Sequence, residues 1–319
     1  MGLQNKELYR NFCQHHPEMP IFLQDWWLDT VCTNGGWDVC LHQAKDGKIL
    51  AVLPYVVLHR LGQRQIGKPL LTPFLGVWAP DWIHSDRLHK RYAFQDKCVA
   101  GLIEQLPKAT ATSVYCGPHF QNWMAFHQNG FRQTEAYTYV LDQLDDEAAL
   151  FQQLKGSVRN KIRKAEKSLS VELPHSIETF YTVNQKTFQR QGLKTPYSLA
   201  FLNRLDKVLA ERQQRMIFIA KDAEGRVHAG LYLIWDHTTA YNLLLGADPA
   251  LRNSGAVQLL LWEAIRYSAR LGKVFNFEGS MLPQIEPIFR DFGARRQPYY
   301  RLYKERNRFW QAIRIALNK

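Results

Sequence analysis

The sequence GADPALRNSGAVQLLLWEAIRYSARLG, residues 246–272, predicts the strand-to-helix connection that decides the fold. It follows an apolar strand, AYNLLL, and Gly255 opens a long helix. A glycine at a helix start lets backbone N–H groups approach a phosphate at the positive end of the helix. An ordinary strand–loop–helix connection would use the same residues, so this motif alone names no ligand.

The next predicted strand, within KVFNFEGSML at residues 273–282, carries a carboxylate at its end. Asn276 and Glu278 alternate with Phe275 and Phe277, and Gly279 ends the strand. A carboxylate at the last residue of a strand, beside a glycine that keeps the space open, suits a proton acceptor or an orienting group. A salt bridge to a neighbouring arginine is the alternative role for Glu278.

A basic helix is predicted at SVRNKIRKAEKSL, residues 157–169, where Ser157 is expected to cap the start. One narrow face is apolar: Val158, Ile162, Ala165 and Leu169. The cations on its other faces include Arg159, Arg163, Lys164 and Lys167. Exposed helices usually mix charges of both signs, but here only Glu166 offers a local partner. These four cations are therefore candidates for binding phosphates, whereas a merely solvated basic face is the alternative.

Composition limits the class of protein. A chain of 319 residues is comfortable for two domains, and a net charge of +12 favours attraction to nucleic acid, phosphorylated cofactors or anionic membranes. The five cysteines form no CxxC pair, which is typical of reduced thiols in a cytoplasm. The polar start and the short apolar run ILAVLPYVVL predict neither a signal peptide nor a transmembrane segment, so we expect a cytoplasmic protein.

Two predicted hairpins indicate an internal duplication. Residues 38–57 and 215–234 each read as two strands joined by a turn containing Asp and Gly, with the second turn longer by two residues. A helical segment is expected before each hairpin and a strand after it. The chain would then divide near residue 135, into 1–135 and 136–319.

A family resemblance follows from the order of five motifs. The motifs RNKIRKAEK, GADPALRNSGAVQLLLWEAI, FNFEGS, IFRDFGA and YYRLYK together resemble the Fem-type branch of the GNAT acyltransferases, which includes the peptidoglycan interpeptide-bridge aminoacyltransferases. This implies an α/β fold of two tandem GNAT-like domains, each a twisted, mixed and mostly antiparallel sheet flanked by helices. Residues 1–135 would form the N-terminal domain and 136–319 the acyltransferase domain.

The resemblance also implies a reaction, the transfer of an acyl or aminoacyl group to an amine of a cell-wall or polysaccharide precursor. Aminoacyl-tRNA, slightly favoured by the charge, or acyl-coenzyme A would be the donor. Glu278 would be catalytic, and Arg252 and Gly255 would join the four cations of the basic helix in binding the donor. No metal and no tightly bound cofactor is expected. RNSGAV has Val257 where the coenzyme A motif has glycine or alanine.

Three alternatives stay open. The chain could be a catalytically silent module that binds an anionic glycan or RNA. Trp78 and Trp82 could touch a membrane surface transiently, near a lipid-linked acceptor. Alternatively they could cover the interface between the domains or line an acceptor cleft. The C-terminal stretch KERNRFWQAIRIALNK, residues 304–319, predicts a helix that either docks on the protein or helps to hold tRNA.

Overall fold

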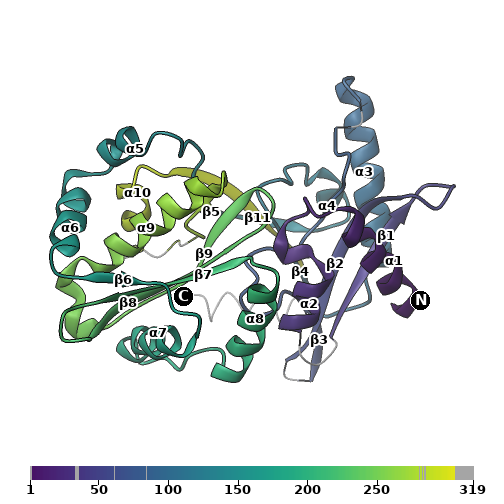
Figure 1. The fold of residues 1–319 in the computed structure, drawn as a ribbon. Helices are drawn as coiled ribbons and strands as arrows, with labels where there is room; N and C mark the ends of the chain where they lie inside the picture. The colour runs from purple at the N-terminus through teal and green to yellow at the C-terminus, as the bar shows by residue number, and fades with distance from the viewer. Residues whose placement is uncertain are drawn as a thin grey trace. The chain divides into compact units, whose positions relative to one another are not determined.

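A computed structural model describes residues 2–32, 36–60, 62–83, 85–279, 281, 283 and 285–305 (Figure 1). The chain forms two compact units. Unit 1 runs to Ala136 and resumes at Pro298, and unit 2 is Tyr137–Gln297. In the described residues no helix is long and apolar enough to cross a membrane.

The sheet of unit 1 has the strand order β1-β2-β3-β4-β11. Neighbouring strands are antiparallel, except that β3 and β4 are parallel. Its elements are α1 (Gly2–His15), the 3-10 helix η1 (Ile21–Leu23), α2 (Asp25–Val31), β1 (Trp37–Gln43), β2 (Ile49–Arg60), β3 (Gln63–Gly67), α3 (Leu88–Gln105), β4 (Ala111–Cys116), α4 (Met124–Gln128) and most of β11 (Arg295–Glu305).

The sheet of unit 2 has the order β5-β10-β9-β8-β7-β6, with β9 and β10 as its parallel pair. Its elements are the end of β5 (Arg132–Leu141), α5 (Glu147–Gln153), α6 (Gly156–Glu166), β6 (Ser170–Glu172), α7 (Glu178–Arg190), α8 (Leu199–Glu211), β7 (Arg215–Lys221), β8 (Val227–Trp235), β9 (Thr239–Ala247), the 3-10 helix η2 (Pro249–Ser254), α9 (Ala256–Arg270), β10 (Val274–Asn276) and α10 (Glu286–Asp291).

The two units repeat one succession of elements. A hairpin leads to a third strand, a helix and a fourth strand parallel to the third: β1-β2-β3-α3-β4 in unit 1 and β7-β8-β9-α9-β10 in unit 2. A helix precedes each hairpin, as expected. A parallel pair requires such a crossover, because a tight turn cannot join strands that run in the same direction. The predicted tandem of mixed, mostly antiparallel sheets is confirmed.

The two hairpin turns have the same length, so the predicted difference of two residues is wrong. The turns are residues 44–48 and 222–226, and in each the first N–H donates to the last carbonyl. Gly47 and Gly225 hold the fourth position with φ of +87° and +77°. Aligning these glycines, rather than the Ala-Lys-Asp letters before them, gives the correct register of the repeat.

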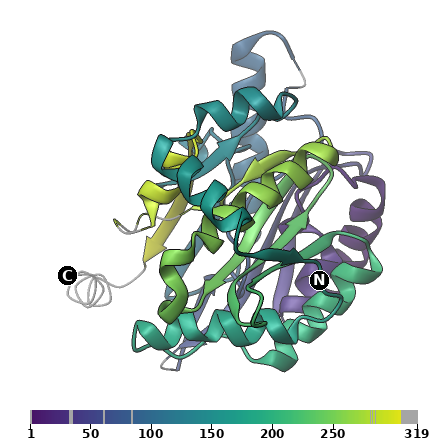
Figure 2. The ribbon, with the colours of Figure 1, turned by 60° about the vertical axis from the view of Figure 1, so that its left-hand side comes forward.

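The sheet of unit 2 is covered by helices on both faces, with α7 on one side and α9 on the other (Figures 1 and 2). Along β7, Phe218 and Ala220 belong to the apolar cluster that includes α9. Ile219, which points the other way, lies beside Phe180 and Val183 of α7. Because both faces of the sheet are buried, β7 and β8 carry runs of apolar residues rather than an alternation of apolar and polar residues.

The last described strand, β11, pairs with a different unit from the one predicted by the sequence. The second domain was expected to run to residue 319, but β11 pairs with β4 of unit 1, from Tyr300 opposite Cys116 to Glu305 opposite Ala111. The expected boundary after residue 135 falls inside β5, next to the unit boundary at Ala136. The helix predicted for the C-terminal stretch lies almost wholly in residues 306–319, outside the described residues.

The packing of α7 on β9 predicts the effect of adding one methyl group. A Cβ at Gly246 would lie 2.5 Å from the Asn184 Cα, so backbone must move. We expect Gly246→Ala to lower the free energy of unfolding by about 1–3 kcal/mol in urea denaturation. Gly156→Ala is the matched control, because its Cβ would be 3.8 Å from the nearest atom. Equal urea midpoints for both variants would contradict the packing.

Candidate active site

The sheet of unit 2 opens where β9 and β10 part. The two strands pair in parallel only from Val274 opposite Thr239 to Asn276 opposite Tyr241. Beyond that point β9 continues to Ala247, whereas β10 has ended. Crevices at the carboxyl ends of parallel strands are where ligands bind in open sheets of this kind. The gap between the second half of β9 and the segment that follows β10 is therefore the candidate active site.

Strand β9 contains a β-bulge, in the part of the strand that lies beyond its pairing with β10. Tyr232 pairs with Leu244 and Leu233 with Asn242, so Leu243 is an extra residue without a partner in the register. Such a bulge takes backbone groups out of the ladder and is common beside active sites. The buried Asn242 sits next to it and donates its side-chain N–H to the Phe277 carbonyl at 3.5 Å. Sequence reasoning missed this pair, although a polar letter inside AYNLLL was a signal.

Glu278 lies beyond β10, not at its last residue as predicted. It is half-buried, and its backbone has a φ of +61°. The buried Asn276 holds this conformation, because its Oδ1 accepts the Glu278 N–H at 2.8 Å and the Thr138 hydroxyl. A left-handed conformation costs a residue other than glycine roughly 1–2 kcal/mol. Strain of this kind is concentrated at functional sites.

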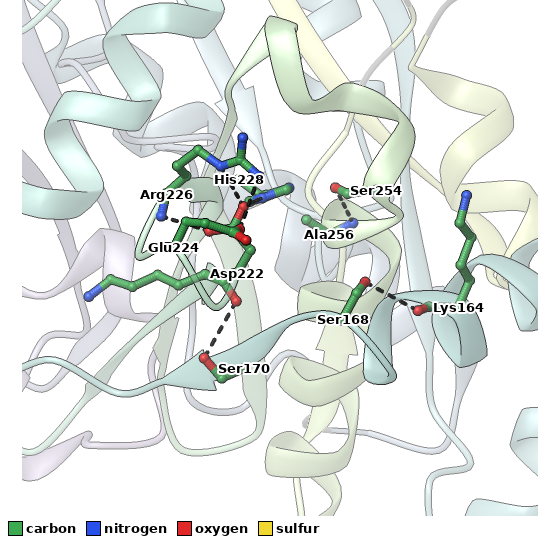
Figure 3. A network of polar contacts seen from close by, with 10 residues as sticks. Lys164, Ser168, Ser170, Asp222, Glu224, Arg226, His228, Ser254 and Ala256 are labelled. Atoms are coloured by element: carbon green, nitrogen blue, oxygen red, sulfur yellow. Dashed lines mark hydrogen bonds and ion pairs between the residues drawn. The ribbon is translucent and has the colours of Figure 1, made fainter.

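The glycine that opens α9 has two structural requirements. Gly255 has a φ of +83°, and a Cβ there would lie 2.6 Å from the Lys161 carbonyl oxygen of α6. The side chain is therefore excluded by α6 as well as by the backbone conformation. Ser254 accepts the Ala256 N–H at the helix start (Figure 3). The predicted approach of a phosphate to these N–H groups stays a prediction.

The connection between β9 and α9 is braced at its first residue. Asp248 accepts the Ala250 N–H at 2.9 Å, which caps η2, and contacts the Lys186 ammonium at 2.5 Å. The hydrogen bond from Lys186 holds the pKa of Asp248 below its usual value. Arg252 lies on η2 with an exposed side chain. Within the described part of the chain it has no ion pair, so its charge is available to a ligand.

The cations of α6 divide into two groups. Arg159 donates to the carbonyls of Gln152 and Leu154, at the end of α5. Arg163 lies 5.4 Å from the Phe151 ring and lines a cavity of about 400 Å³ with, among others, two carboxylates, those of Glu147 and Glu166.

Lys164 and Lys167 are exposed, as is Arg163, but they lie at the end of α6 that packs beside Gly255. Figure 3 shows Lys164 with Ser254 and Ala256 in one view. Of the predicted phosphate-binding residues, the structure thus places Arg159 and Arg163 beside α5. Lys164 and Lys167 share the part of unit 2 around the start of α9.

Three of the four residues predicted for the apolar face of α6 lie on that helix, but the predicted cap is wrong. Val158, Ile162 and Ala165 are buried in the core of unit 2. Leu169 lies beyond the end of α6 at Glu166, and it packs against the same core. Lys155 is the N-cap residue and no side chain caps the helix, so the Ser157 cap is wrong. The chain is held there by Asp291, whose carbonyl accepts the Lys155 N–H at 2.9 Å.

A second polar cluster lies at the β7–β8 turn (Figure 3). Asp222 contacts the Arg226 guanidinium at 2.7 Å and the His228 Nε2 at 2.9 Å. The hydrogen bond from His228 holds the pKa of Asp222 well below its usual range. The His228 carbonyl accepts the Asp248 N–H at 2.9 Å, so this cluster adjoins the start of the β9–α9 connection. Sequence reasoning passed over it because the histidines are scattered.

The described residues give little support to metal chemistry or to a cysteine nucleophile. No group of three His, Cys, Asp or Glu side chains in them could hold a metal ion. Burial raises the pKa of the Cys116 thiol to about 12, so it stays protonated at neutral pH and is a poor nucleophile. Trp78 packs against Phe12, with ring centroids 5.8 Å apart, whereas Trp82 lines a cavity in unit 1. Their membrane contact stays a prediction.

A family model matches the part of the chain that contains the candidate site. Residues 152–278 match the model described as acetyltransferase (GNAT) domain. The matched part extends from the end of α5 to Glu278 and so contains the parting of β9 and β10 and the start of α9. No curated protein sequence matches the chain.

Solved structures share the fold at low sequence identity. The crystal structure of FemX is 12% identical, with a TM-score of 0.64, over 92% of this chain and 95% of that chain. The C-terminal domain of a putative lysylphosphatidylglycerol synthetase from Agrobacterium fabrum is 11% identical, with a TM-score of 0.53, over 94% and 92%. A tandem GNAT protein from the clavulanic acid biosynthesis pathway is 9% identical, with a TM-score of 0.51, over 84% and 82%.

The division of α6 predicts different outcomes for two neighbouring cations. We expect Arg159→Gln to lower the free energy of unfolding by about 1 kcal/mol, because two carbonyls of α5 lose their charged donor. Lys164→Gln, the matched control, should change it by less than about 0.5 kcal/mol. Thermal and urea unfolding of both variants provides the measurement. An equal loss in both would contradict a structural role confined to Arg159.

Proposed function

We propose that this protein transfers an acyl or aminoacyl group to an amine, because residues 152–278 match the GNAT acetyltransferase model and the fold resembles that of FemX. The observation that carries the proposal is the strained Glu278 beside the parting of β9 and β10. An unfavourable backbone conformation at a residue with a carboxylate is typical of a site where the position of that carboxylate is needed for a reaction.

In the proposed reaction the amine nitrogen attacks the acyl carbon of the donor. A bond forms between nitrogen and carbon, and the bond from that carbon to the ester oxygen or thioester sulfur breaks. Glu278 accepts the proton that the amine loses, and the leaving oxygen or sulfur takes up a proton. Burial and the nearby carboxylates of Asp236 and Glu278 raise the pKa of Tyr241, which supports a Glu278 carboxylate directed toward β9.

The developing negative charge on the acyl oxygen needs hydrogen-bond donors. We assign this task to the Leu243 N–H, because the bulge removes that residue from the ladder with β8. Asn242 supports it by joining β9 to the Phe277 carbonyl across the gap. Both residues precede the turn toward α9, so donor phosphates at the helix start and the acyl group at the bulge would lie along one strand.

The donor phosphates would be held at the start of α9. Arg252, Lys164 and Lys167 are exposed cations of η2 and α6, the elements that adjoin the positive end of α9. We favour aminoacyl-tRNA over acyl-coenzyme A, since the net charge of +12 suits a polyanion. The acceptor that the Fem-type resemblance implies is an amine-bearing cell-envelope precursor.

Two variants of one residue test the catalytic assignment. Glu278→Gln should reduce transfer by about 10²–10⁴-fold while donor binding stays unchanged, because the proton acceptor is lost. Glu278→Gly should be equally inactive but no less stable, since glycine accepts a positive φ without strain. Single-turnover transfer to a peptidoglycan precursor with a free lysyl amine and urea unfolding supply the two readouts. Full turnover in Glu278→Gln would refute the role of Glu278 and leave the family assignment intact.

Salt titrations test the donor. Binding of bulk aminoacylated tRNA should be saturable and weaken steeply with salt, with a slope reduced by about one unit in Lys164→Gln or Arg252→Gln. Tight binding of acetyl-coenzyme A with weak tRNA binding would instead identify an acetyltransferase. If the protein binds neither donor, a catalytically silent module is favoured. The same tRNA without its aminoacyl group is the control for binding that depends only on electrostatic attraction.

A further inference from the structure

A cavity of about 620 Å³ lies within unit 1, and none of the residues proposed for catalysis lines it. It is formed by residues 82–83, the first half of α3 and residues 121–124, which follow β4. Three of its lining residues have aromatic rings: Trp82, Tyr92 and Trp123. Its size is within the range of pockets that hold small ligands.

Two of the elements around this cavity have counterparts in unit 2. The repeated succession of elements makes α3 the counterpart of α9, and β4 the counterpart of β10. The cavity lies between α3 and the segment that follows β4, and no residue of β3 lines it. In unit 2 the candidate active site instead adjoins β9, the counterpart of β3.

Buried hydrogen bonds hold the floor of the cavity in one arrangement. Gln95 is 6% exposed and donates to the Trp82 carbonyl at 2.8 Å. The Asn122 amide donates to the Gln95 Oε1 at 3.0 Å and to the Asp96 Oδ1 at 3.1 Å. Helix α3 is thus joined to the segments before and after it, and a preorganised site loses little entropy when a ligand binds.

Three large apolar or aromatic side chains of the cavity lining are exposed to solvent. Ile83 is 65% exposed, Tyr92 52% and Met124 51%, and all three line the same cavity. Clusters of exposed apolar groups of this kind mark binding sites. Because these side chains line a cavity rather than a flat surface, we expect a ligand that binds inside the cavity.

The charges at the cavity select a neutral ligand. Its lining carries one guanidinium, that of Arg91, and one carboxylate, that of Asp96, so the formal charges cancel. A nucleic acid or an anionic membrane would call for an excess of cations. Hydroxyl groups both donate and accept hydrogen bonds, and Arg91, Asp96 and the exposed Gln121 supply partners of both kinds.

From these observations we infer that the cavity is a binding site for a neutral glycan. Pyranose rings present C–H groups to the electron-rich faces of Trp82, Tyr92 and Trp123, while their hydroxyls meet the polar side chains. The site belongs to unit 1 alone and does not include Glu278. Loss of sugar binding and loss of acyl transfer are therefore separate outcomes.

Titration calorimetry of the full chain with chitotriose and with cellotriose tests the site. We expect saturable binding of at least one of them, about tenfold weaker in Tyr92→Ala and retained in Tyr92→Phe, which keeps the stacking ring. Gln121→Ala, also at an exposed residue, should weaken binding by loss of a polar contact. Leu88→Ala is the matched control, because Leu88 is exposed on the same helix but does not line the cavity.

Three results would overturn the inference. The first is the absence of saturable heat with either sugar, and the second is binding that Tyr92→Ala leaves unchanged. The third is Tyr92-dependent sedimentation with phosphatidylglycerol vesicles in place of sugar binding, which would identify a membrane-docking surface. Transfer by Glu278→Gln has no bearing on any of them.

Discussion

The parallel pairing of β9 with β10 ends after Tyr241 and Asn276, and the candidate active site depends on that ending. If β10 continued, its backbone would pair with the second half of β9. Instead Asn276 accepts the Glu278 N–H, and Glu278 adopts a left-handed conformation. The register of β9 with β8 shifts at Leu243, in the part of β9 beyond its pairing with β10. Strand termination, backbone strain and a bulge thus occur together in one part of the sheet.

The contact between α6 and α9 places charge at the donor end of this opening. Gly255 allows the Lys161 carbonyl of α6 to approach the start of α9 closely, because no α9 side chain stands between them at that point. The C-terminal turn of α6, with Lys164, is thereby held beside the positive end of α9. Cations and helix N–H groups that act at one place bind an anion more strongly than either group does alone.

Duplication of the scaffold separates two kinds of recognition. In unit 2 the segment that follows the parallel strand β10 carries the strained Glu278 carboxylate. In unit 1 the segment that follows β4 lines a cavity with aromatic rings and charges that cancel. One succession of elements thus carries different side chains in its two copies, and function depends on those side chains rather than on the fold.

The sequence by itself determined the local elements, since hydrophobic periodicity and glycine turns depend on near neighbours in the chain. It predicted the apolar face of α6, the start of α9 at Gly255 and both hairpins. Tertiary structure decided the partner of Arg159, the return of β11 to unit 1 and the conformation of Glu278. These depend on residues far apart in the chain, such as Thr138 and Asn276, whose hydrogen bond forms only when β5 and β10 pair.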